Sequence, residues 1–121
     1  KDYGNAFIVV LYINVMVELN IDANEVKKKM DRKEKFILLD VRTKWERDIV
    51  KLEDNKFIPI QEGEERYKEL DKKKEIICYC HHGNRSLIAA QFLHEKGFKA
   101  KSMNGGIEYW AYAIDKNMRR Y

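Results

Sequence analysis

The sequence of 121 residues contains little cysteine and no repeat, low-complexity tract or linker. Its two cysteines, Cys78 and Cys80, lie two positions apart, and a disulfide between them would be strained. The sequence therefore indicates no disulfide framework and favours a reducing, cytoplasmic setting. We expect one domain over residues 1–121, with its core at about 15–118, because this length supports a single core.

No apolar segment is long enough to cross a membrane. The stretch AFIVVLYINVMV at 6–17 has only twelve residues, and no small-residue cleavage site follows it. We expect this segment to be a buried strand or a packing extension. A contact in a homodimer is the alternative, and no membrane partner is predicted.

Concentrated positive charge is also lacking, although the net charge is +4, from 24 basic and 20 acidic residues. The lysines alternate with acids, as in EVKKKMDRKEK and KELDKKKE. A nucleic-acid footprint would need basic residues gathered on one surface, preferably with aromatics for stacking. The lysine runs therefore indicate a solvated face, and no nucleic-acid partner is predicted.

Strand patterns alternate with helical patterns along the chain. Unbroken apolar runs at 35–41 and 75–80 are typical of strands buried on both faces. Shorter strands are expected at 56–60 and 99–103, and Pro59 must then lie at a strand end or on a free edge. Helices are expected at 21–30, 43–50, 62–71 and 86–98 and from about 106.

Local signals support several of these boundaries. Thr43 with Glu46 forms a capping-box pattern, as does Asp22 with the acid three positions on. Gly97 stands where a left-handed helix C-cap belongs. The alternation predicts an α/β fold with a mainly parallel central sheet of about five strands and helices on both faces.

The stretch IICYCHHGNRSLIAAQFL at 76–93 carries the candidate chemistry. Its loop follows a strand and precedes a helix, and ligands bind at such carboxyl ends in parallel sheets. A metal site would need Cys78, Cys80, His81 and His82 as ligands. However, zinc sites usually pair such ligands with a second pair far away in the sequence, so no metal is predicted.

A cysteine nucleophile fits the same loop better. The sulfur of Cys80 would lie near unpaired N–H groups of the following helix, which favour negative charge. Arg85 adds a permanent cation, and Gly83 allows the backbone to form an anion-binding nest. Cys78, inside the strand, is expected to be an inert core thiol.

Four stretches together make the chain similar to the rhodanese-like sulfurtransferases, single-domain type: FILLDVRTKWE, IPI, YCHHGNRS and GFKAKSMNGGIEYW. The resemblance runs from about Val15 to Trp110. It implies that Cys80 accepts a sulfur atom as a persulfide, with no cofactor. It implies that Asp40 and Arg42 brace the site. The resemblance implies a substrate cradle formed by His81, His82, Gly83, Asn84, Arg85 and Ser86.

The resemblance also implies roles for neighbouring residues. Arg85 would stand at the rim and favour an anionic donor. Trp45 and Glu46 would serve packing and capping. The segment containing Gly105, Gly106 and Trp110 would close the core near the site. The rings of His81 and His82 are expected to point outward, with a proton-transfer role as the alternative.

Loop length separates this activity from a related one. Four residues lie between Cys80 and Arg85, whereas the phosphatases and arsenate reductases that resemble rhodaneses have one more. We therefore expect sulfur transfer rather than phosphate chemistry. A non-catalytic binding or regulatory module is a further alternative, although such modules commonly lack the cysteine.

The resemblance leaves the partners open. The donor and acceptor could be thiosulfate, cyanide or thiols, or a protein of a sulfur relay. The connection VKLEDNKFIPI departs from the family pattern at Val50, Lys51, Asp54 and Asn55 without changing the length. Because this connection shapes the pocket rim, it affects donor preference.

Overall fold

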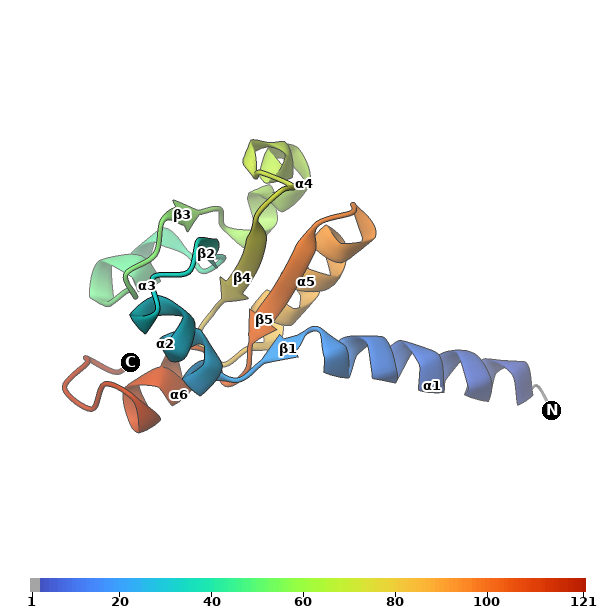
Figure 1. Ribbon diagram of the computed structural model, residues 1–121, viewed down its shortest axis with the longest axis horizontal. Helices are drawn as coiled ribbons and strands as arrows, with labels where there is room; N and C mark the ends of the chain where they lie inside the picture. The colour runs from blue at the N-terminus through green and yellow to red at the C-terminus, as the bar shows by residue number, and fades with distance from the viewer. Residues whose placement is uncertain (1–2) are drawn as a thin grey trace.

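A five-stranded parallel sheet forms the centre of the computed structural model, which describes residues 3–121 (Figure 1). Every strand pair is parallel, in the order β1-β5-β4-β2-β3. The strands are β1 Asn20–Ile21, β2 Phe36–Asp40, β3 Lys56–Phe57, β4 Glu75–Tyr79 and β5 Lys99–Met103. The predicted α/β fold is therefore confirmed.

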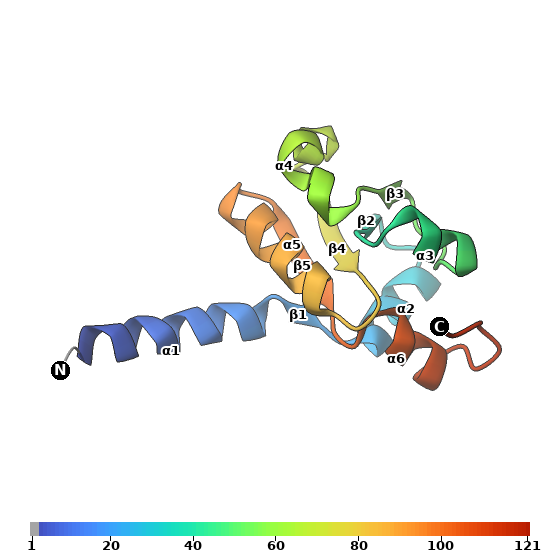
Figure 2. The same cartoon turned by 180° about the vertical axis from the view of Figure 1, so that it is seen from behind.

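Helices connect the strands and cover both faces of the sheet (Figures 1 and 2). The α-helices are α1 Tyr3–Glu18, α2 Ala23–Asp31, α3 Lys44–Ile49, α4 Gly63–Arg66, α5 Asn84–Glu95 and α6 Gly106–Ala113. Two 3-10 turns, η1 Ile60–Glu62 and η2 Tyr67–Glu69, flank α4. The expected helix at 62–71 is thus broken into short helical pieces.

Alternate residues of the strands build two separate cores. Leu39 and Cys78 face a cluster that includes Leu93 of α5. Leu38 and Ile77 face the opposite cluster, with α2 and α6. This alternation follows from the period of two along a strand, and it places helices on both faces as predicted.

Several boundary predictions are confirmed by the backbone. Thr43 and Glu46 form a complete capping box at the start of α3. Asp22 is the N-cap of α2, but its side chain accepts from Asn24 N–H rather than from Glu25 N–H, so the capping-box pattern expected there is reduced to a simple N-cap. Gly97 has φ +90°, in the left-handed region. Pro59 lies beyond the end of β3, which is an edge strand.

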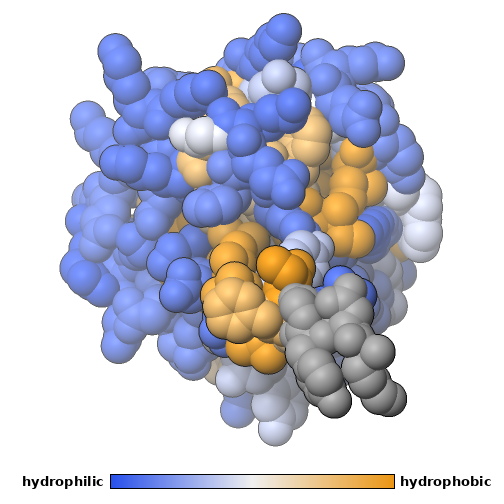
Figure 3. All heavy atoms as spheres, turned by 90° about the vertical axis from the view of Figure 1, so that its right-hand side faces the viewer, coloured by the Kyte–Doolittle hydropathy of each residue, from blue (hydrophilic) through white to orange (hydrophobic). Residues whose placement is uncertain are grey.

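The segment 6–17 contradicts the expectation of a buried strand. It lies within α1, which projects from the domain (Figures 1 and 2), and hydrophobic atoms gather on the side of the molecule from which this helix projects, on a largely hydrophilic surface (Figure 3). The Tyr12 hydroxyl bonds to Gln91 Oε1 of α5 at 2.9 Å. Among residues 3–121, no helix has the length and hydropathy needed to cross a bilayer. The exposed apolar side chains of α1 include Phe7, Ile8, Val9, Val10, Leu11 and Ile13.

The connection between α3 and β3 is anchored by the buried side chain of Tyr79. The Tyr79 hydroxyl lies 2.6 Å from Asp54 Oδ2 and 3.2 Å from Asp40 Oδ2, and it accepts from Leu52 N–H at 3.2 Å. Burial raises the pKa of this hydroxyl well above its usual range, so it remains a donor. Asp54, one of the positions that depart from the family pattern, therefore accepts a hydrogen bond from the core residue Tyr79.

Replacing Tyr79 with Phe should lower the free energy of unfolding by about 1–3 kcal/mol, because it leaves buried polar groups without their partner. Urea denaturation would measure the loss. Tyr112→Phe is the matched control, since Tyr112 is 65% exposed and the same atom is removed there. Equal stability of both variants would show that the hydroxyl does not anchor the connection.

Candidate active site

The sulfur of Cys80 lies at the carboxyl end of β4, in the centre of the sheet. It accepts hydrogen bonds from the N–H groups of Gly83 at 3.1 Å and of Ser86 at 3.3 Å. Gly83 adopts φ +108° as the N-cap of α5, a conformation that suits glycine and turns its N–H toward the sulfur. Two N–H groups of the expected cradle are therefore directed at one thiol.

A buried pair of serines extends this arrangement below the sulfur. Ser86 Oγ lies 3.4 Å from Cys80 Sγ and 2.7 Å from Ser102 Oγ of β5, and it also bonds to the Gly83 carbonyl. Both serines have no exposed surface. Ser102 was not predicted as a site residue, because a single serine in a short strand gives no signal.

The two cysteines differ in their surroundings. Cys78 is fully buried in the apolar core, and burial, followed by the proximity of Cys80, raises the pKa of its thiol well above its usual value. Cys80 is also buried, at 1% exposed, but its sulfur faces N–H donors. Cys78 is thus buried away from solvent and held in the protonated thiol form, as expected for an inert core residue.

The start of α6 holds the loop in place from the other side. Ile107 N–H donates to the Cys80 carbonyl at 2.9 Å, and Glu108 N–H donates to the His81 carbonyl at 3.0 Å. Gly106 has φ +62°, and a Cβ there would lie 2.3 Å from the His81 carbonyl oxygen. The close approach therefore requires glycine at this position.

The Asp40 and Arg42 side chains lie at the carboxyl end of β2, the strand that pairs with β4, and are completely buried. The two side chains form an ion pair, in which Arg42 Nη2 lies 2.9 Å from Asp40 Oδ2. The backbone N–H of Arg42 also donates to Asp40 Oδ1. Val41 N–H donates to the Tyr79 carbonyl, which connects this strand end to the residue before Cys80. The position fits the bracing role implied by the family pattern.

The Arg85 guanidinium forms a two-point ion pair with Glu46. Nη1 and Nη2 lie 2.7 Å and 2.9 Å from Oε1 and Oε2. The Glu46 side chain is 5% exposed, and that of Arg85 is 34% exposed. The cation expected to face the donor is therefore already paired with a carboxylate.

The imidazole of His81 does not point outward as expected. Its ring stacks between the rings of His82, at 3.9 Å, and Tyr121, at 3.8 Å. Burial, followed by the proximity of His82, lowers the pKa of His81, which favours a neutral ring. His82 and Asn84 are exposed, so for His82 the outward orientation is confirmed.

Tyr121 was missed by the sequence reasoning. Its hydroxyl accepts from Arg42 Nη1 at 3.0 Å and donates to Glu46 Oε2 at 2.7 Å, so it joins the two ion pairs. Trp45, expected to serve packing, is 62% exposed and meets the Tyr121 ring edge to face. No local pattern connects Tyr121 to residues more than 70 positions earlier.

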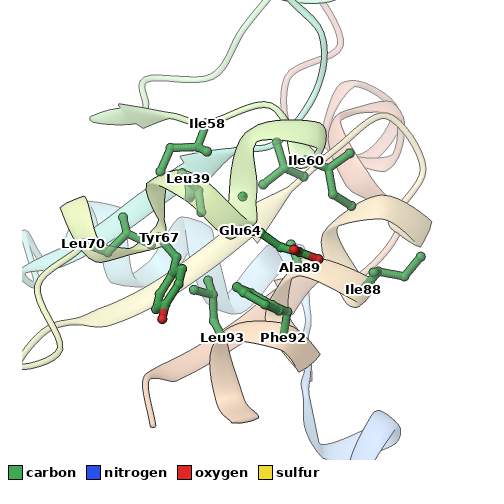
Figure 4. A pocket seen from close by; sticks show the side chains of 12 residues that line it. Leu39, Ile58, Ile60, Glu64, Tyr67, Leu70, Ile88, Ala89, Phe92 and Leu93 are labelled. Atoms are coloured by element: carbon green, nitrogen blue, oxygen red, sulfur yellow. The ribbon is translucent and has the colours of Figure 1, made fainter. Parts of the chain in front are cut away.

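A separate apolar pocket of about 150 Å³ lies between α5 and the α4–η2 segment (Figure 4). Leu39, Tyr67 and Phe92 line it, and Glu64 contributes a carboxylate at its edge. Within the part of the chain that the structure describes, none of residues 80–86 lines this pocket. No group of three His, Cys, Asp or Glu side chains among the described residues is suited to hold a metal.

A family model for the rhodanese-like domain matches residues 22–113. The chain belongs to this family. The match spans β2, the Cys80 loop and α6, which are the parts of the fold that build the site.

Several curated relatives of this rhodanese-like chain have the word sulfurtransferase in their names. It is 35% identical to the adenylyltransferase and sulfurtransferase MOCS3 of Arabidopsis thaliana, over 86% of this chain and 26% of that protein. It is 32% identical to the thiosulfate sulfurtransferase GlpE of Coxiella burnetii, over 75% of this chain and 82% of that protein. The chain thus spans about a quarter of MOCS3 but most of GlpE.

A crystal structure of a rhodanese-related protein from Thermoplasma volcanium has the same fold. Its TM-score is 0.73 at 30% identity, covering 78% of this chain and 92% of the other. This similarity agrees with the assignment of the chain to the rhodanese-like family.

Replacing Gly106 with Ala should displace the rhodanese-like loop. The left-handed backbone alone costs about 1–2 kcal/mol for a residue with a Cβ, and the clash with the His81 carbonyl adds to it. Thermal unfolding and the rate of Cys80 alkylation by iodoacetamide would both be measured, and both should change.

Gly63→Ala provides the control for this substitution. A Cβ at Gly63 meets nothing within 4 Å, and its φ of −61° is helical. This variant should keep the alkylation rate and unfold at the same temperature or slightly above it. Similar behaviour of the two variants would contradict the role assigned to Gly106.

Proposed function

We propose that the chain transfers a sulfane sulfur from a donor such as thiosulfate to a thiophilic acceptor through a persulfide on Cys80. One observation carries the proposal: Cys80 Sγ accepts N–H bonds from Gly83 and Ser86 in a six-residue loop at the carboxyl end of β4. Backbone donors stabilise a negative charge on sulfur without any metal or organic cofactor.

The reaction consists of two displacements. The Cys80 thiolate attacks the outer sulfur of thiosulfate, an S–S bond forms, and sulfite leaves with the electron pair of the broken bond. An acceptor such as cyanide or a thiolate then attacks the terminal sulfur and releases the Cys80 thiolate. Covalent catalysis of this kind predicts ping-pong kinetics.

The backbone N–H groups have a role in both displacements. During the attack they solvate the charge on the Cys80 sulfur, and in the persulfide they favour negative charge on the outer sulfur. The buried Ser86 hydroxyl, 3.4 Å from the sulfur, can turn its hydrogen toward a thiolate while Ser102 donates to Ser86. The chain of hydroxyls thus supplies a further donor.

Two alternatives have less support. A non-catalytic module has no need for a thiol held by N–H donors, yet Cys80 is so held. A phosphatase needs a wider loop for a tetrahedral oxyanion, and only four residues lie between Cys80 and Arg85. Sulfur transfer remains the function that accounts for both features.

The partners that we propose follow from this chemistry. Small donors and acceptors include thiosulfate, cyanide and thiols, and a sulfur-relay protein is supported by the similarity to MOCS3, named a sulfurtransferase. A cytoplasmic setting is supported by the two free thiols of Cys78 and Cys80.

A homodimer would use α1, whose exposed apolar side chains include Phe7 at 65% and Ile8 at 61%. Burial of such side chains favours association. Sedimentation velocity over a range of concentrations should show a dimer that Phe7→Ser with Ile8→Ser disrupts, whereas a monomer at all concentrations would contradict this contact.

Incubation with excess thiosulfate should add about 32 Da, one sulfur atom, to the intact mass, following the covalent intermediate. Cyanide or dithiothreitol should reverse the addition. Cys80→Ser should lose both the adduct and the turnover, because the nucleophile is gone.

The matched control is Cys78→Ser, which removes the other thiol and should keep most of the adduct and turnover. The native chain should not hydrolyse an aryl phosphate at a comparable rate. An adduct located on Cys78, or phosphatase turnover equal to sulfur transfer, would overturn the assignment.

A further inference from the structure

The Glu46 carboxylate is a fixed negative charge beside the active-site loop. Its side chain is 5% exposed, and Oε1 accepts from Thr43 N–H at 3.2 Å and from Thr43 Oγ1 at 3.0 Å. Oε2 accepts from the Tyr121 hydroxyl at 2.7 Å. Burial alone would raise the pKa of Glu46, but the hydrogen bonds from Arg85, Tyr121 and Thr43 outweigh it and hold the pKa well below its usual range.

The guanidinium of the loop is consequently half of a neutral pair. Arg85 reaches Glu46 with both Nη atoms, in the two-point geometry that makes such pairs strong. A charge that is already paired attracts an approaching anion much less than a free one. Arg85 therefore gives the loop little net attraction for a dianion.

The charged groups that Tyr121 connects to the Glu46–Arg85 pair also balance. Arg42 and Arg47 are paired with Asp40 and Asp54, two cations with two anions. Glu108 of α6 is paired with Arg120. The lowered pKa of His81 keeps that ring neutral near pH 7. The paired groups thus leave no excess positive charge to receive thiosulfate.

We propose that Glu46 determines donor specificity: by neutralising Arg85, it makes the site prefer an alkyl persulfide to the dianion thiosulfate. The proposal rests on the proposed function, since it concerns the sulfur that Cys80 accepts. The preferred donor is a persulfide, R–S–SH, in which R belongs either to a small thiol or to a protein cysteine. The leaving group is then a thiolate rather than sulfite.

The two donor reactions differ in charge but not in bonds. With the persulfide, Cys80–S⁻ and R–S–SH give Cys80–S–SH and R–S⁻, which then takes a proton from water. With thiosulfate, Cys80–S⁻ and S–SO3²⁻ give Cys80–S–S⁻ and SO3²⁻. The Cys80 thiolate is therefore repelled more strongly by the thiosulfate dianion than by the persulfide. An unpaired anion at Glu46 would repel thiosulfate further.

The test compares kcat/KM for thiosulfate with kcat/KM for the persulfide of 2-mercaptoethanol, a small alkyl persulfide whose R group carries no charge and which is less negative than the thiosulfate dianion. Glu46→Gln keeps the size and one acceptor oxygen but removes the charge, so Arg85 becomes a free cation. The ratio of thiosulfate to persulfide should rise roughly tenfold, and the rise should shrink in high salt.

A second variant shifts the ratio in the opposite direction. Arg85→Ala leaves the Glu46 anion unpaired, and the ratio should fall below the native value. Replacing both residues with Gln removes both charges and should return the ratio to near the native value. Damage to the loop would change the donor ratio in the same direction in both single variants. Opposite changes in this ratio therefore identify an effect of charge.

Glu69→Gln is the matched control for the change in net charge. Glu69 pairs with Arg66 in the α4–η2 segment and is bonded to no residue of the loop. This variant should leave the donor ratio unchanged. Circular dichroism and thermal unfolding would establish that each variant is folded, and the Arg85→Ala result stands alone if Glu46→Gln does not fold.

The outcomes separate this proposal from the proposed function. Failure of both donors to place sulfur on Cys80 of the native chain would reject the function itself. Transfer from both donors with an unchanged ratio in Glu46→Gln and Arg85→Ala would reject the specificity role alone. A protein persulfide that reacts faster than the small one would identify the source of the persulfide as a partner protein.

Discussion

The contact between Gly106 and the carbonyl groups of Cys80 and His81 is the constraint on which the site depends. These carbonyls follow directly after β4, and they accept from Ile107 and Glu108 at the start of α6. With its carbonyls held from that side, the loop can turn the N–H groups of Gly83 and Ser86 toward the sulfur. The sheet centre and the C-terminal helix thus fix the loop together.

A continuous set of polar contacts connects this loop to the buried sheet end. Asp40 binds Arg42, Arg42 reaches the Tyr121 hydroxyl, and that hydroxyl donates to Glu46, which binds Arg85. Buried charges are costly unless they are paired and hydrogen-bonded, and each of these groups has its partner. The arrangement therefore fixes the rim of the site by interactions between elements far apart in the sequence.

Local patterns predicted the parts of the fold that depend on neighbouring residues. The apolar run of β4, the Thr43 capping box and the left-handed Gly97 were all readable, because each depends on residues a few positions apart. The segment 6–17 failed for a physical reason. It is apolar on every side, so periodicity could not separate a helix from a buried strand, and its length should have favoured the helix.

The residues of the candidate site likewise fall into those that local patterns predicted and those that they did not. The family pattern placed Cys80 and its loop, but the ion pair of Arg85 with Glu46 joins residues 39 positions apart, and Tyr121 lies 75 positions from Glu46. Such long-range contacts arise from the folded arrangement of α3, α5 and the C-terminal segment. No spacing within a short window encodes them.

The division between backbone and side chains in this site has a functional consequence. The groups that contact the sulfur most closely are N–H donors of Gly83 and Ser86, and substitution of most side chains leaves them in place. The charges of the rim come from side chains on separate elements, and Cys80 itself is only 1% exposed. A donor must therefore pass the rim before the loop can act on its sulfur. In the proposed function the loop backbone stabilises charge on the sulfur, and in the proposed specificity the choice of donor depends on how the rim charges are paired.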